Sequence, residues 1–151
     1  MCKVIADHAA VADILIVDDT PANLDVLVEM LEEQGYSARP VPSGFLALQS
    51  ARVQPPDLIL LDINMPEMNG YEVCKHLKAD ENLKDIPVVF ISALRDTTDK
   101  VLAFDAGAVD YIAKPFQFEE VKARVQTHLR IYRMQKQLEQ QYTAIKALEE
   151  L

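Results

Sequence analysis

The chain reads LILLDINMPEMNG at residues 58–70. Four aliphatic residues in a row, followed by turn-forming residues, predict a strand that is covered on both faces, as in a parallel α/β sheet. Ligands of such sheets bind in the crevice beyond the carboxyl ends of the strands. Asp62 directly follows the strand, so we expect its carboxylate at this crevice. An aspartate that caps a helix or closes a turn is the alternative, and Asp62 alone does not exclude it.

Strand-like runs and helical patterns alternate along the chain. Strands are expected at residues 14–17, 37–41, 58–61, 88–91 and 109–112. Helices are expected at residues 22–34, from Ser43 to a point before Pro55, from Asn69 or Gly70 through Leu77, and from Asp96 or Thr97 to Gly107, the last with Val101, Leu102 and Ala106 facing inward. This alternation predicts a doubly wound, five-stranded parallel sheet in an α/β domain, with helices on both faces.

Composition limits the classes of function. The chain has 151 residues and a formal net charge of −9, from 15 Lys and Arg against 24 Asp and Glu. This charge argues against nonspecific binding to nucleic acid or to an anionic membrane surface, and we expect neither as a partner. We find no signal peptide and no run long enough to span a bilayer, and Cys2 and Cys74 suggest neither a disulfide framework nor a zinc site. We therefore expect a cytoplasmic protein with reduced thiols.

Several strands end in polar residues that should share one edge of the sheet. Asp18 and Asp19 follow the first strand, Asp62 the third, Ser92 the fourth and Lys114 the fifth. Three clustered carboxylates repel one another, so a cation is needed to offset their charge. Oxygen ligands suit Mg²⁺, with Mn²⁺ or Ca²⁺ as alternatives. A carboxylate beside a divalent cation and a lysine suits attack on a phosphoryl group, with Asp62 as the nucleophile.

These motifs resemble the receiver domain of two-component response regulators. The resemblance covers roughly residues 12–130 and rests on five elements: DD at 18–19, LLDINMP at 60–66, NG at 69–70, SA at 92–93 and DYIAKP at 110–115. It implies a flavodoxin-like sheet of order 2-1-3-4-5 with five helices. Residues 1–12 would then be a flexible leader, residues 13–130 the receiver domain and residues 131–151 a helical extension.

The resemblance also implies roles for individual residues. Asp62 would accept a phosphoryl group from a histidine kinase or phosphotransfer protein. Mg²⁺ would be held by Asp19, Asp62 and the backbone carbonyl of Asn64, with Asp18 acting mainly through a metal-bound water. Ser92 and Lys114 would each contact a phosphoryl oxygen, and the Lys114–Pro115 bond would be cis.

Tyr111 lies where relatives place a switch aromatic. If Ser92 moves toward the phosphoryl oxygens, Tyr111 can turn inward and remodel a surface that binds an output domain or a downstream protein. A half-buried strand aromatic with no switch role is the alternative. Leu94 matches a position that influences phosphoryl lifetime in relatives. His76 and His128 fall in helical patterns, where exposure is expected, and His8 in the leader, so no histidine is expected to be a ligand.

The helical pattern continues beyond the end of a typical receiver domain. Steps of three and four connect Ile131, Met134, Leu138, Gln141, Ile145 and Leu148, as in a coiled coil. This seam predicts either a parallel homodimer whose helices lead toward an output module, or an amphipathic linker helix that frays in solution.

The strand-end aspartate also fits two other classes of function. Haloacid dehalogenase-like phosphatases also use a strand-end aspartate with Mg²⁺, but they usually carry a second carboxylate two residues later, where this chain has Asn64. The third possibility is a receiver-like binding domain that works without phosphorylation. We favour the regulatory phosphoacceptor, which is not an enzyme beyond its own phosphorylation and dephosphorylation.

Overall fold

The computed structural model describes residues 11–93 and 97–151. The elements in chain order are β1 (Asp13–Val17), α2 (Pro21–Glu33), β2 (Ser37–Val41), α3 (Gly44–Val53), β3 (Leu58–Leu61), α4 (Gly70–Ala79), β4 (Val88–Ser92), α5 (Thr97–Asp105), β5 (Asp110–Ala113) and α6 (Phe118–Glu149). The strands form one parallel sheet in the order β2-β1-β3-β4-β5. The predicted fold and strand order are confirmed.

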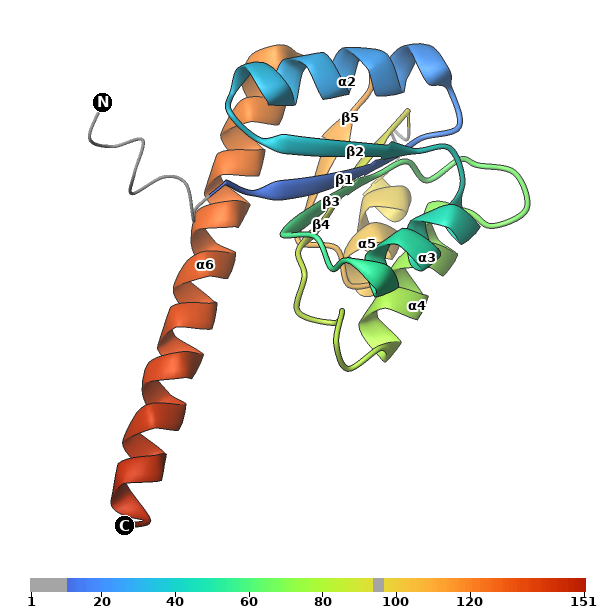
Figure 1. The fold of residues 1–151 in the computed structure, drawn as a ribbon. Coiled ribbons are helices and arrows are strands. Elements are labelled where there is room, and N and C mark those ends of the chain that lie inside the picture. The colour runs from blue at the N-terminus through green and yellow to red at the C-terminus, as the bar shows by residue number, and fades with distance from the viewer. Residues whose placement is uncertain (1–10, 94–96) are drawn as a thin grey trace.

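The helices cover both faces of the sheet (Figure 1). On one face, α2 and α6 pack against the sheet through a hydrophobic cluster that includes Leu27 and Val125. On the other face, α3, α4 and α5 pack through a second cluster that includes Leu48, Val73 and Ala103. All four residues of β3 are buried, as expected for a strand between two helical layers.

The helix ends follow local chemistry. The Ser43 hydroxyl accepts a hydrogen bond from Leu46 N, which confirms Ser43 as the cap of α3. Asn69 and Glu72 form a reciprocal capping box at the start of α4. After α2 the chain turns at Gly35 with a φ of 91°, a conformation that other residues rarely adopt.

Two details of the sequence prediction were wrong around α5 and β5. β5 runs one residue later than predicted. Val101 and Leu102 do not face inward, since they are 51% and 47% exposed, whereas Ala103 and Ala106 are buried. Ala103 in α5 and Ala106 just after it make the contact with the core, and the larger Val101 and Leu102 stay exposed. The Asp96 cap and Leu94 lie outside the described residues.

The last helix extends far beyond the sheet (Figure 1). Its first part is anchored by Val121, Val125 and Leu129, and from residue 133 onward its side chains are exposed. Within the described chain, no helix is long and apolar enough to cross a membrane.

His128 is not an exposed helix residue, contrary to the prediction. Its side chain is 15% exposed, and its Nε2 lies 2.8 Å from Asp110 Oδ2. Arg124 Nη1 also donates to both oxygens of Asp110, at 2.9 and 2.8 Å. Asp110 in turn accepts a hydrogen bond from Tyr111 N, so these side chains tie α6 to the start of β5. His76, in contrast, is exposed as predicted.

Candidate functional site

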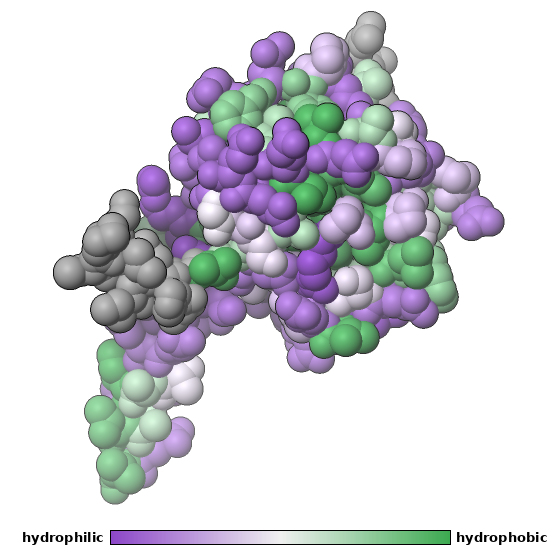
Figure 2. All heavy atoms as spheres, turned by 45° about the horizontal axis from the view of Figure 1, so that its top comes forward, coloured by the Kyte–Doolittle hydropathy of each residue, from purple (hydrophilic) through white to green (hydrophobic). Residues whose placement is uncertain are grey.

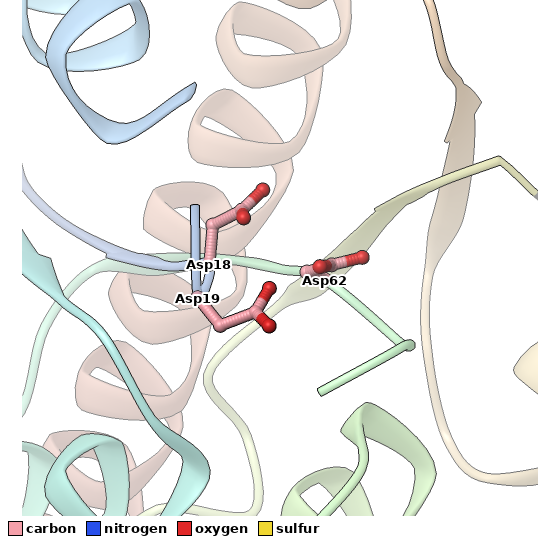
Figure 3. Close-up of side chains that lie close together, drawn as sticks. All are labelled: Asp18, Asp19 and Asp62. Carbon is pink, nitrogen blue, oxygen red and sulfur yellow. The ribbon is translucent and has the colours of Figure 1, made fainter. Parts of the chain in front are cut away.

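Three carboxylates meet at the carboxyl ends of the central strands β1 and β3. Asp18 and Asp19 follow β1, and Asp62 follows β3, where the hydrogen bond from Asp62 N to Val17 O (2.9 Å) continues the sheet. Each residue offers one oxygen, and these oxygens lie within 4.8 Å of one another. Figure 3 shows the three side chains reaching toward the same side of the strand ends. Asp18 and Asp62 are buried, whereas Asp19 is exposed. The predicted carboxylate cluster is therefore present.

Lys114 supplies a positive charge to this cluster. It follows β5, and its backbone is fixed by a hydrogen bond from its N to Ser92 O and by a cis peptide bond to Pro115, as the resemblance implied. Lys114 Nζ lies 3.0 Å from Asp18 Oδ2 and 3.6 Å from Asp62 Oδ1. One ammonium group thus faces three carboxylates, which leaves the cluster with an excess of negative charge.

Asp62 is energetically unlike a surface carboxylate. Burial raises its pKa to about 6, and the nearby charges of Asp18 and Asp19 add to this. Lys114 and a hydrogen bond from the Asn64 backbone act in the opposite direction. An aspartate used only as a helix cap has its charged form stabilised by backbone N–H groups, so a raised pKa argues against that role.

Ser92 and Tyr111 lie next to this cluster. The Ser92 side chain is fully buried, and its hydroxyl has no hydrogen-bond partner among the described residues. The Tyr111 hydroxyl donates to Ser92 O at 3.3 Å, and the residue is 7% exposed. Tyr111 therefore lies in an inward position. Lys100 Nζ lies 5.7 Å from the centre of its ring.

The loop after Asp62 is held close to the site by Gly70. Gly70 N donates to Ile63 O at 2.8 Å. A side-chain Cβ at this position would overlap the carbonyl oxygen of Asp62 and lie 2.8 Å from Ile63 Cα. Only glycine lets α4 start this near the backbone of Asp62. Asn64 lies exposed in this loop, two residues beyond Asp62.

Asn23 is a further residue of this site that the sequence did not predict. Its Nδ2 donates to Asp18 Oδ2 at 3.2 Å. The available signal was its position four residues after Asp19, in the first turn of a helix that begins at the edge carrying the site. Polar side chains at that point of an α/β fold face the ligand crevice.

Comparison with known proteins identifies the family. The response regulator receiver domain model matches residues 14–126. The chain is 44% identical over 117 residues to the DNA-binding dual master transcriptional regulator RpaA of Synechocystis, covering 78% of this chain and 48% of RpaA. It is also 44% identical over 116 residues to a probable cyclic di-GMP phosphodiesterase of Vibrio cholerae, covering 77% of this chain and 26% of that protein. The chain thus spans half or less of the length of these relatives.

Solved structures agree with this match. The receiver domain of the sensor histidine kinase PA1611 from Pseudomonas aeruginosa, determined with a magnesium ion in its active-site cleft, has a TM-score of 0.74 and 34% identity, over 79% of this chain and 98% of that one. The receiver domain of a histidine kinase from Syntrophus aciditrophicus has a TM-score of 0.74 and 38% identity, over 79% and 90% of the two chains. The chain belongs to the receiver domains of two-component response regulators.

Proposed function

We propose that Asp62 is the phosphoryl acceptor of this receiver domain, and that a histidine kinase or a histidine phosphotransfer protein is the donor. The observation that carries this proposal is the position of Asp62, which is buried among two other carboxylates, with the Lys114 ammonium 3.6 Å from its Oδ1. A carboxylate can act as the nucleophile in group transfer, and cations stabilise the charge that develops on the oxygens of the transferred group. Asp62 and Lys114 suit these two roles.

The carboxylate cluster fits a hard divalent cation, because its ligands are oxygens whose negative charge exceeds that of Lys114. Asp18, Asp19, Asp62 and the backbone carbonyl of Asn64 would hold Mg²⁺, and Mn²⁺ could take its place. The magnesium ion in the PA1611 receiver domain supports this assignment. When bound, the cation neutralises negative charge on the oxygens of the transferred group.

The chain's own side chains account for the transfer. A carboxylate oxygen of Asp62 forms a bond to phosphorus, the N–P bond of a phosphohistidine breaks, and its electron pair stays on the imidazole nitrogen. Lys114 then pairs with a phosphoryl oxygen. The Ser92 hydroxyl, which has no partner among the described residues, donates a hydrogen bond to another.

Phosphorylation is proposed to act on partners through Ser92 and Tyr111. The Tyr111 hydroxyl is bonded to the carbonyl of Ser92, so a shift of Ser92 toward the phosphoryl group moves the acceptor of that bond. The group adds about −1.5 to −2 charges and three acceptor oxygens, which is enough to favour one position of this pair. The affected surface would be that of α5, β5 and α6, where an output domain or a downstream protein would bind.

Incubation with acetyl phosphate and Mg²⁺, followed by intact mass measurement, tests this function. We expect one added phosphoryl group on the wild type and none on Asp62→Asn, an isosteric variant. Multiple-turnover release of phosphate from varied esters would instead indicate a phosphatase. Asp62 follows the third strand, and Asn64 stands where such a phosphatase carries its acid, so we do not expect this result. No adduct with any donor would indicate a domain that works without phosphorylation.

We also propose that the exposed seam of α6 pairs with that of a second copy in a parallel coiled coil. Ile131, Met134, Leu138, Ile145 and Leu148 are between 44% and 68% exposed, and Figure 2 shows hydrophobic side chains along the free part of the helix. In a parallel, in-register pair of helices, the two Gln141 side chains face each other and their amides can form a hydrogen bond. Light scattering should show a dimer that Leu138→Asp converts to a monomer. A monomeric wild type, both with and without acetyl phosphate, would exclude the dimer.

A further inference from the structure

Among the described residues of α2, Asn23 alone makes a side-chain hydrogen bond to the carboxylate cluster. It is the third residue of the helix, and its side chain is partly buried. Its Nδ2 lies 3.2 Å from Asp18 Oδ2. The contact links the start of a helix to a buried carboxylate that lies next to Asp62.

The start of α2 is built around Asp18 rather than around a capping side chain. Thr20 is the N-cap residue, but its side chain makes no capping hydrogen bond. Its backbone N instead donates to Asp18 Oδ1 at 2.9 Å. The carboxylate of Asp18 is therefore held through both oxygens, by Thr20 on one side and Asn23 on the other. Two such bonds fix the rotation of the carboxylate as well as its position.

Lys114 and Asn23 share the same oxygen of Asp18. Lys114 Nζ lies 3.0 Å from Asp18 Oδ2, nearer than its 3.6 Å distance from Asp62 Oδ1. If Lys114 pairs with a phosphoryl group on Asp62, it must give up part of its contact with Asp18. The Asp18 side chain is only 3% exposed, so bulk water cannot readily replace that contact.

We infer that Asn23 is a positioning residue of the phosphorylation site, which keeps the Asp18 carboxylate oriented toward the metal when Lys114 turns to the phosphoryl group. The inference rests on the proposed function, since it needs a cation at the cluster. Asn23 suits this task because its amide is a neutral donor. It orients Asp18 without adding a positive charge that would repel Mg²⁺.

Magnesium affinity, measured by titration calorimetry with Mg²⁺ alone, tests the inference. We expect Asn23→Ala to weaken Mg²⁺ binding by roughly 10-fold, a typical effect of removing a residue that orients a metal ligand. Val26→Ala, on the same helix and 49% exposed, is the matched control and should leave the affinity unchanged. Alanine favours helix more than asparagine does, so a weaker α2 cannot explain the loss. Unfolding in EDTA checks that each variant folds.

Two further variants test whether Asn23 orients Asp18 when the Lys114 contact to Asp18 is absent. In a Lys114→Met background, Asn23 is the remaining side-chain donor to Asp18 Oδ2 within residues 11–93 and 97–151. Asn23→Ala should therefore weaken Mg²⁺ binding by a larger factor there than in the wild type. An equal loss of Mg²⁺ affinity on Asn23→Ala in both backgrounds would overturn the idea that Asn23 matters more once Lys114 no longer contacts Asp18. An unchanged affinity of Asn23→Ala would overturn the whole inference while leaving the proposed function intact. A wild type that binds no Mg²⁺ would overturn both.

Discussion

Replacing Ser92 with alanine should stabilise the unphosphorylated protein while impairing its phosphorylation. The Ser92 hydroxyl is fully buried and has no partner among the described residues. An unpaired buried polar group costs about 1–3 kcal/mol, and Ser92→Ala removes that cost. Alanine fits a strand slightly less well, so we expect a net gain of about 1 kcal/mol. For a chain of this size this corresponds to a rise in Tm of roughly 2–4 °C.

Urea unfolding followed by circular dichroism, in EDTA, measures this gain. The same proteins with acetyl phosphate and Mg²⁺ should show a lower phosphorylated fraction for Ser92→Ala, because one hydrogen bond to the phosphoryl group is lost. Ser43→Ala is the matched control. It removes a hydroxyl that accepts a hydrogen bond from Leu46 N, so it should destabilise by about 0.5–2 kcal/mol without affecting phosphorylation.

The refuting result is a loss of stability in Ser92→Ala similar to that in Ser43→Ala. It would mean that the Ser92 hydroxyl already has a partner in solution. A gain in stability with normal phosphorylation would refute the second half of the reasoning, since the hydroxyl would then be unpaired but unused.

Three further predictions concern the surroundings of Asp62. Gly70→Ala should move the Asp62 backbone, which should lower stability by about 1–3 kcal/mol and also impair phosphorylation. Gly35→Ala is the control, because it is strained by a φ of 91° but has no atom within 4 Å of the added Cβ. It should lower stability without affecting phosphorylation. In EDTA, the folded protein holds a proton on Asp62 up to about pH 6, whereas the unfolded chain releases it near pH 4. As the pH rises from 4 to 6, the free energy of unfolding of the wild type should therefore fall relative to that of Asp62→Asn. Parallel pH profiles of unfolding for the two proteins would contradict the raised pKa. Burial alone would raise the pKa of Asp110, but hydrogen bonds from His128, Tyr111 N and Arg124 hold this pKa below its usual range. The ionised Asp110 therefore stabilises the fold above about pH 4, and this contribution is lost as the pH falls further. Asp110→Asn should remove this acid dependence from urea unfolding curves.

The sequence predicted the sheet and its polar edge because both depend on local signals. Four buried residues in β3 give an unbroken apolar run, and parallel strands bring their carboxyl ends to one edge. The order of Asp18, Asp62 and Lys114 along the chain was therefore enough to place them together. The roles proposed for Ser92 and Tyr111 came from a resemblance to a known family, because no spacing rule would give them.

What the sequence did not reveal depends on side-chain contacts between elements. The inward face of α5 was misassigned because Val101 and Leu102 are more apolar than the alanines that form the contact. The bond between His128 and Asp110 joins a helix to a strand that lies 18 residues earlier, and the bond from Asn23 to Asp18 depends on how α2 leaves β1. Periodicity gives the face of a helix, but it does not give the partner of a polar side chain on that face.

The energetics of the site favour the proposed functional role of Asp62 over a purely structural one. The capping task beside it falls to Asn69, which forms the box with Glu72 at the start of α4. Asp62 instead has a raised pKa, lies near two other carboxylates and adjoins a buried hydroxyl without a partner among the described residues. Each of these features costs folding free energy. A divalent cation would offset the carboxylate repulsion, and a phosphoryl group would satisfy the hydroxyl and Lys114. A divalent cation and a phosphoryl group together would therefore account for all three costs, whereas helix capping explains none of them.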